Sequence, residues 1–204
     1  MPAAEFFNKF RIFSEKNFLD QEFCNLLCDE MSKAPQSNTT SFDSNGAGLI
    51  EDVEYTKRKD VLTLPNEILK KLEKKLIGKI PELEEQFGIE INGLQQITPS
   101  IYSTGDYAGP HTDNPPIADV PEYIRNRKAS IVIFLNEESI VEKEGAYCGG
   151  NLTFYGLIEG KTFQNVGMPV VGEAGMLIAF PPNRTHQVTK VTAGKRYVIV
   201  SFYD

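Results

Sequence analysis

Histidine and cysteine are scarce in this chain, which has two histidines and three cysteines among 204 residues. Cys24 and Cys28 are four residues apart on an expected helix, so they share one face, but a zinc site would need two more ligands, and none is nearby in the sequence. We therefore interpret Cys24, Cys28 and Cys148 as buried thiols of a reducing cytoplasm. The sequence thus gives no indication of a structural zinc site.

Long apolar runs and long basic runs are missing as well. No stretch approaches the roughly 18 apolar residues that suggest a membrane-spanning helix, and the N-terminal segment lacks the apolar core of a signal peptide. Asp and Glu number 28 against 21 Lys and Arg, giving a net charge of −7, and the basic cluster at residues 125–128 is short. These features predict a cytoplasmic protein that acts on neither membranes nor nucleic acids.

The composition that remains, 41% apolar and 24% charged, is typical of a globular protein, and the length suits one domain over residues 1–204. Apolar residues recur at helical spacing in the first part of the chain. Helices are therefore expected over residues 21–32, 65–77 and 81–87, with a Gly/Asn/Ser-rich loop over residues 34–49.

Short β-like segments follow from residue 89 onwards, separated by Gly, Pro and Asn. The run Ala-Ser-Ile-Val-Ile-Phe-Leu at residues 129–135 predicts a buried strand. Further strands are expected over residues 94–102, 151–155, 169–171, 175–180 and 195–203. This spacing is typical of a sandwich or barrel. The predicted fold class is α+β and mainly β, with helical support over about residues 1–90 and a β core over about residues 91–204.

Both histidines lie at positions where their side chains could bind a metal ion. His111 precedes Asp113 by two residues, and alternate residues of an extended segment point to the same side, so both can reach one ion. His186 follows the apolar run of residues 176–180, where an antiparallel strand could bring its side chain to the same end of the sheet as His111 and Asp113. Two imidazoles and one carboxylate hold iron(II) on one face and leave the other face open. A His-x-Asp pair is common by chance, so the hypothesis also depends on the surrounding residues.

Four ordered blocks carry that additional signal. They are residues 102–113 (YSTGDYAGPHTD), 131–136 (IVIFLN), 149–154 (GGNLTF) and 179–197, which contains AFP, His186 and GKRY. Together they resemble the iron(II)/2-oxoglutarate-dependent dioxygenases of the prolyl 4-hydroxylase-like branch. The resemblance extends from about residue 97 to residue 203 and implies that the core is a double-stranded β-helix, a cupin-like jelly-roll.

The resemblance implies that His111, Asp113 and His186 bind Fe²⁺, with 2-oxoglutarate and O2 as cosubstrates. The implied reaction hydroxylates an unactivated C–H bond and releases succinate and CO2. Halogenating relatives lack the carboxylate ligand, so the presence of Asp113 favours hydroxylation.

The resemblance also implies that Arg196 binds the distal carboxylate of 2-oxoglutarate. A guanidinium suits this role because it stays charged and can donate two parallel hydrogen bonds to a carboxylate. Tyr102 matches the family tyrosine that contacts the cosubstrate, and Thr153 is expected to line the same cavity. On a strand, the face of Arg196 would be continued by apolar residues, which are Val198, Val200 and Phe202.

Two polar segments, residues 38–60 and 114–128, are expected to be loops that cover the open face and recognise the substrate. The candidate substrate contacts are Arg58, Asn114, Arg125 and Arg127. An alternative interpretation is that these charges only solvate the loops.

The substrate class stays open at this point, because a fold and a metal site do not fix it. One possibility is a prolyl or other residue of a peptide, and the other is a small molecule such as an amino acid or a biosynthetic intermediate. Two further classes are a non-catalytic metal-binding jelly-roll protein and a cupin-like metalloenzyme that does not use 2-oxoglutarate. Neither needs Arg196, which argues against both. The oligomeric state is also left open.

Overall fold

The structure, a computed structural model, describes residues 9–39, 56–116, 120–158 and 165–204. The helices in these segments are α2 (Gln21–Lys33), α3 (Asn66–Ile77), α4 (Ile80–Phe87) and α5 (Glu122–Arg125). The first three agree with the expected helices. Helix α2 begins after Asp20, whose carboxylate accepts a hydrogen bond of 2.7 Å from the Phe23 amide, which satisfies an N–H group that the helix itself leaves unpaired. No helix in the described segments is long and apolar enough to span a membrane.

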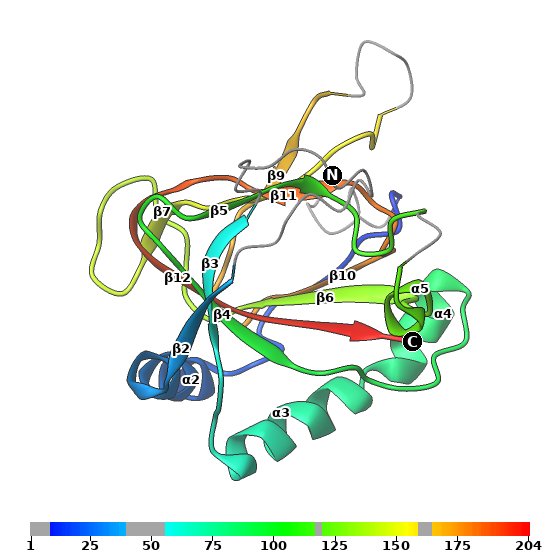
Figure 1. The fold of residues 1–204 in the computed structure, drawn as a ribbon, viewed down its shortest axis with the longest axis horizontal. Helices are drawn as coiled ribbons and strands as arrows, with labels where there is room; N and C mark the ends of the chain where they lie inside the picture. Colours follow the sequence, from blue (N-terminus) through cyan, green and yellow to red (C-terminus); the bar gives the residue numbers. More distant parts are fainter. Residues whose placement is uncertain (1–8, 40–55, 117–119, 159–164) are drawn as a thin grey trace.

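The strands form two sheets that share one strand (Figure 1). The larger sheet has the order β1 (Phe13–Glu15), β10 (Leu177–Phe180), β6 (Ala129–Phe134), β12 (Val191–Tyr203), β4 (Thr98–Ser103), β3 (Thr56–Val61) and β2 (Gln36–Thr39). The second sheet has the order β3, β5 (Tyr107–His111), β11 (His186–Val188), β8 (Leu152–Phe154) and β9 (Met168–Val170). The short strand β7 (Tyr147–Gly149) pairs with the first part of β12. All of these pairings are antiparallel, as in a jelly-roll.

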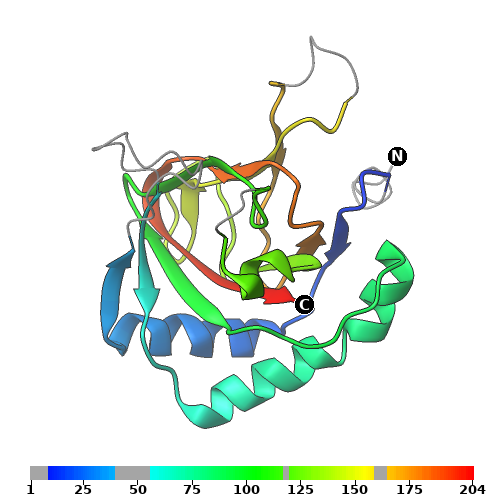
Figure 2. The ribbon, with the colours of Figure 1, turned by 45° about the vertical axis from the view of Figure 1, so that its right-hand side comes forward.

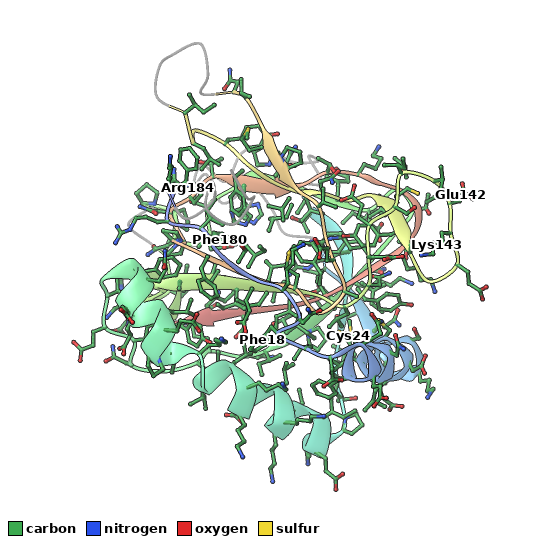
Figure 3. All side chains as sticks on the ribbon, turned by 180° about the vertical axis from the view of Figure 1, so that it is seen from behind. Phe18, Cys24, Glu142, Lys143, Phe180 and Arg184 are labelled. Atoms are coloured by element: carbon green, nitrogen blue, oxygen red, sulfur yellow. The ribbon has the colours of Figure 1, made fainter. Side chains whose placement is uncertain are left out.

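Strand β6 shows how the two layers of the core arise. All six of its residues are buried. Ile131 and Ile133 belong to the core cluster beneath helices α2, α3 and α4, whereas Val132 and Phe134 belong to the cluster between the two sheets. Alternate residues of a strand point to opposite faces, so a strand that is covered on both sides has to be apolar throughout. Helices α2, α3 and α4 lie against the outer face of the larger sheet (Figure 2). Figure 3 shows Phe18 and Cys24 on that side and Phe180 between the sheets.

Three strands occupy the first 90 residues, where only helices and loops were expected. Strand β2 lies within the expected loop 34–49, and β3 covers the last part of the expected substrate loop 38–60 and extends one residue beyond it. In β3 the four residues between the buried Thr56 and Val61 are charged, so the strand has no apolar alternation for a sequence pattern to reveal. Residues 40–55 of these expected loops lie outside the described residues. Helix α5 likewise occupies part of the expected loop 114–128.

The three cysteines are free thiols. Cys24 is buried, as expected, whereas Cys28 and Cys148 are only partly so. Burial raises the pKa of Cys24 to about 11 and that of Cys28 to about 12. Both thiols are therefore protonated at neutral pH and poor nucleophiles.

Candidate metal and cosubstrate site

The two histidines come from neighbouring strands of the second sheet. His111 ends β5, His186 begins β11, and the two residues are directly paired in the antiparallel register. Their ring centroids are 4.3 Å apart. The sheet therefore places both imidazoles side by side, although 75 positions separate them in the chain.

Asp113 completes the group just after β5. Its backbone amide donates a 2.8 Å hydrogen bond to the Pro182 carbonyl, which turns the carboxylate back towards the histidines. Its Oδ1 lies 3.6 Å from Nε2 of His111, and its Oδ2 lies 3.5 Å from Nε2 of His186. One candidate ligand atom from each of the three residues lies within 4.8 Å of the others. Two nitrogens and one oxygen at this spacing fit a single divalent metal ion.

The other ring nitrogen of each histidine is held by the backbone. Nδ1 of His111 lies 2.7 Å from the Gly109 carbonyl, and Nδ1 of His186 lies 2.9 Å from the Arg184 carbonyl. A carbonyl oxygen can only accept, so each Nδ1 carries the proton and each Nε2 is left with its lone pair. This is the tautomer that a metal ligand requires, fixed before any ion binds.

Electrostatics at the group also favour a cation. Burial lowers the pKa of His186 to about 4, so the imidazole is neutral at physiological pH and can bind a metal. For Asp113, burial raises the pKa, but His186, His111 and a hydrogen bond from Ser130 outweigh it and hold the pKa below its usual range. Asp113 is therefore ionised and half-buried, an arrangement that a divalent cation would stabilise.

Ser130 was not expected at this site. Its hydroxyl donates a 2.6 Å hydrogen bond to Oδ2 of Asp113. It lies on β6 in the same alternation as Val132 and Phe134, which face the space between the sheets. A lone polar residue in the inward positions of a buried strand was the signal that could have identified it.

Replacing Ser130 with alanine should lower iron(II) affinity by about 10- to 100-fold, the usual cost of removing a group that orients a metal ligand. The hydroxyl fixes the carboxylate rotamer of Asp113 without contacting the metal position itself. Competition with a coloured chelator would measure the affinity. Ser130→Thr keeps the hydroxyl and should retain most of the affinity, whereas equal affinities for the alanine variant and the wild type would contradict this role.

Arg196 lies between the sheets on β12 and is 1% exposed. It is paired across the strands with Tyr102 of β4, and its guanidinium carbon lies 5.1 Å from the ring centroids of both Tyr102 and Phe134. Val198 and Val200 continue its face into the apolar cluster, as expected from their spacing. The charge is therefore enclosed by apolar and aromatic groups.

Two nitrogens of this guanidinium, Nε and Nη2, are buried and have no hydrogen-bond partner within the part of the chain that the structure describes. A buried charge without a partner costs several kcal/mol, roughly, unless something pairs with it. The natural partner for a guanidinium fork is a carboxylate, which accepts two parallel hydrogen bonds. Arg196 thus has the properties of a binding residue for an acidic ligand.

Thr153 is not brought to this cavity. Its neighbours Leu152 and Phe154 belong to the cluster between the sheets, so Thr153 points to the opposite face of β8. There it is paired with Gln187 of β11. Sequence pattern could not decide this, because a one-residue change of register reverses which face each side chain occupies.

The residues expected to contact the substrate make contacts within the protein. Arg58 lies on β3, forms a 2.9 Å ion pair with Asp60 and donates a 3.4 Å hydrogen bond to the Tyr102 hydroxyl. Arg127 stacks on Phe202 at 3.4 Å and donates to the backbone carbonyl of the metal-site residue Asp113 at 2.9 Å.

The side-chain amide of Asn114 donates to the carbonyl of Arg125, an exposed residue of α5. Together with the bond from Arg127, this contact ties α5 to the segment after β5. A role of these four side chains in substrate recognition stays a prediction.

The sequence matches a family model, that of the 2OG-Fe(II) oxygenase superfamily, over residues 97–204, slightly more than half of the chain. The chain belongs to this superfamily. It is therefore a dioxygenase whose family uses Fe²⁺, 2-oxoglutarate and O2, and the His-Asp-His group could hold the iron. No curated protein sequence matches the chain.

Solved structures with this fold include several prolyl hydroxylases. A Pseudomonas putida prolyl-4-hydroxylase is 14% identical with a TM-score of 0.68, covering 98% of this chain and 95% of that one. A Trichoplax adhaerens prolyl hydroxylase, solved with a hypoxia inducible factor peptide fragment, is 18% identical with a TM-score of 0.67, covering 98% and 86%. A viral collagen prolyl hydroxylase from Paramecium Bursaria Chlorella virus-1, solved with 2OG, is 17% identical with a TM-score of 0.60, covering 95% of both chains. This oxygenase therefore has the prolyl 4-hydroxylase-like jelly-roll fold.

Proposed function

We propose that this oxygenase holds iron(II) through His111, Asp113 and His186, binds the distal carboxylate of 2-oxoglutarate through Arg196, and hydroxylates a prolyl-type residue in a peptide. The observation that carries the cosubstrate assignment is the buried guanidinium of Arg196, with two nitrogens unpaired among the described residues. The likeness to structures described as prolyl hydroxylases supports the substrate class.

The residues present fit both groups. Two Nε2 atoms and a carboxylate converge on one point, and an acid with a second carboxylate could pair with Arg196. When bound, iron(II) and 2-oxoglutarate supply the oxidising chemistry, in which O2 is consumed, 2-oxoglutarate becomes succinate and CO2, and one oxygen atom enters the substrate C–H bond.

The protein's own contribution is to orient the reacting groups and to exclude water. The carbonyls of Gly109 and Arg184 hold the two imidazoles in the ligand tautomer, and Ser130 holds the carboxylate of Asp113. The apolar residues between the sheets, with Tyr102 and Phe134 against Arg196, keep the interior dry, which strengthens the ionic contact with the cosubstrate.

Anaerobic addition of iron(II) and 2-oxoglutarate to the metal-free protein should give a weak visible charge-transfer band. With Arg196→Ala, the 2-oxoglutarate concentration needed for half of the band should rise by about 10- to 100-fold, because an ionic hydrogen-bonded contact contributes roughly 1.5–3 kcal/mol. The exposed Arg125→Ala is the matched control and should behave as the wild type. Absence of the band in folded, iron-loaded wild-type protein would contradict the proposed function. The protein would then be a non-catalytic metal-binding protein or a cupin that does not use 2-oxoglutarate.

The substrate class is tested separately by succinate formation. Proline-containing peptides should stimulate it above the uncoupled background, whereas free proline and other amino acids should not. Stimulation by free amino acids alone would replace the peptide proposal with a small-molecule hydroxylase while leaving the oxygenase chemistry in place.

A further inference from the structure

Tyr147 is a second buried side chain with a polar atom that is left unpaired among the described residues. It lies on β7 and is 1% exposed. Its hydroxyl forms no hydrogen bond of normal geometry within the segments that the structure describes, although it lies near the guanidinium of Arg196. Neither the sequence motifs nor the family match gives this residue a role. A buried hydroxyl that makes no hydrogen bond is costly, by about 1–3 kcal/mol, so its retention calls for a physical reason.

The β7–β12 pairing brings Tyr147 close to Arg196. Tyr147 is paired with Gly194, and Arg196 is two residues further along β12 on the same face, a diagonal position that long side chains reach across a sheet. Both side chains pack over Gly150, where a Cβ would lie 3.1 Å from Cδ of Arg196 and 3.5 Å from Cδ2 of Tyr147. The side chains of Tyr147 and Arg196 therefore both pack against Gly150 and lie close to each other.

Phe134 and Gly172 define where the hydroxyl lies. The guanidinium carbon of Arg196 is 5.1 Å from the Phe134 ring centroid, and a Cβ at residue 172 would collide with both the Tyr147 hydroxyl and the Phe134 ring. The tyrosine hydroxyl and the guanidinium thus border the same aromatic ring, and glycine at 172 leaves the room that the hydroxyl occupies.

The Tyr147 hydroxyl stays protonated at neutral pH, so it can donate a hydrogen bond. Burial raises the pKa of Tyr147 to about 12, and Arg196 opposes part of that rise through its charge and through its nearby N–H groups. Three buried polar atoms that lack a hydrogen-bond partner in the described segments thus lie in one region, namely the Tyr147 hydroxyl oxygen and Nε and Nη2 of Arg196. All three can donate, and a carboxylate offers about four acceptor positions for them.

We propose that the Tyr147 hydroxyl donates a hydrogen bond to the distal carboxylate of 2-oxoglutarate beside Arg196, and so selects a 2-oxo diacid over a 2-oxo monoacid. This rests on the proposed function of Arg196. Arg196 supplies the charge, and Tyr147 adds a neutral donor whose position is fixed by β7. A monoacid would leave all three atoms unpaired, which is the source of the selection.

The test is a titration of iron-loaded, anaerobic enzyme with two probes, 2-oxoglutarate and 2-oxopentanoate, which has the same chain length but no distal carboxylate. Tyr147→Phe should weaken 2-oxoglutarate binding by about 10-fold or more, as for a hydrogen bond to a charged group, and leave 2-oxopentanoate and iron(II) binding unchanged. A purely structural role would weaken both probes alike.

Tyr203→Phe is the matched control. Its hydroxyl is also buried but donates to the Leu76 carbonyl at 2.6 Å, on the helix side of the larger sheet. It should reduce stability without changing the preference between the two acids. Tyr147→Leu, which also lacks the hydroxyl, serves if the phenylalanine variant does not fold.

The outcomes separate this inference from the proposed function. If Arg196→Ala weakens 2-oxoglutarate binding but Tyr147→Phe does not, or if the tyrosine variant weakens both acids equally, the Tyr147 assignment is wrong and that of Arg196 stands. If neither variant affects 2-oxoglutarate binding, the proposed function fails as well.

Discussion

Asp113→Asn is expected to lower iron(II) affinity by more than about 100-fold and to abolish 2-oxoglutarate turnover, since removing groups that merely orient a ligand already costs 10- to 100-fold. The substitution removes the negative charge of the triad and gives one of its two positions an N–H group in place of an acceptor. Those positions face Nε2 of His111 and Nε2 of His186. Iron content after dialysis, chelator competition and succinate formation would measure the effect.

Asp106→Asn is the matched control for that variant. Asp106 is also a buried carboxylate and accepts a 2.8 Å hydrogen bond from the Ser103 amide, but it does not belong to the metal group. Its substitution should leave iron affinity within about 3-fold of the wild type, the scatter expected for a site with no direct part in the metal contact. Similar losses in the two variants would show that a general loss of buried charge, not the removal of a ligand, is responsible.

Gly175→Ala should destabilise the fold by at least about 3 kcal/mol, combining left-handed backbone strain with overpacking. Gly175 has φ +78°, and a Cβ there would collide with the Leu19 carbonyl oxygen. The same glycine accepts a hydrogen bond from the Leu19 amide and donates one to the Phe134 carbonyl, at 3.1 and 2.8 Å, so the backbone cannot move away without breaking one of them. Urea unfolding followed by circular dichroism would measure the loss.

Gly145→Ala measures the conformational part of that loss alone, so the difference between the two variants gives the steric part. Gly145 has the same φ of +78°, but no described atom lies within 4 Å of the position that its Cβ would take. It should cost only the left-handed conformation, about 1–2 kcal/mol. If the two variants lost equal stability, the close approach of Leu19 to Gly175 would contribute nothing.

The helices and the histidine pair were within reach of sequence reasoning because their signals are local. The apolar stripes predict α2 and α3 without reference to the rest of the chain. His111 and His186 are conspicuous because the chain contains no other histidine, and the structure does bring them together with Asp113. The assignment of metal binding to these residues remains a prediction.

The structural features that could not be predicted from the sequence depend on pairing between distant segments. Strand β3 has charged residues at its centre, and only its pairing with β2, β4 and β5 makes it a strand. The outward direction of Thr153 is set by the register of β8 against β11, and the proximity of Tyr147 to Arg196 is set by the register of β7 against β12. None of these follows from the residues within one window.

Strand β12 has a consequence for the order in which the molecule can assemble. It lies between β4 and β6 in the larger sheet and hydrogen-bonds to both. Because β4 and β6 precede β12 in the chain, a ribosome releases both before the strand that joins them, and their facing edges stay unpaired until residues 191–203 emerge. Unpaired strand edges invite aggregation. Pairing of β12 with β4 and β6 thus closes both edges and brings the guanidinium of Arg196 into the interior in the same step.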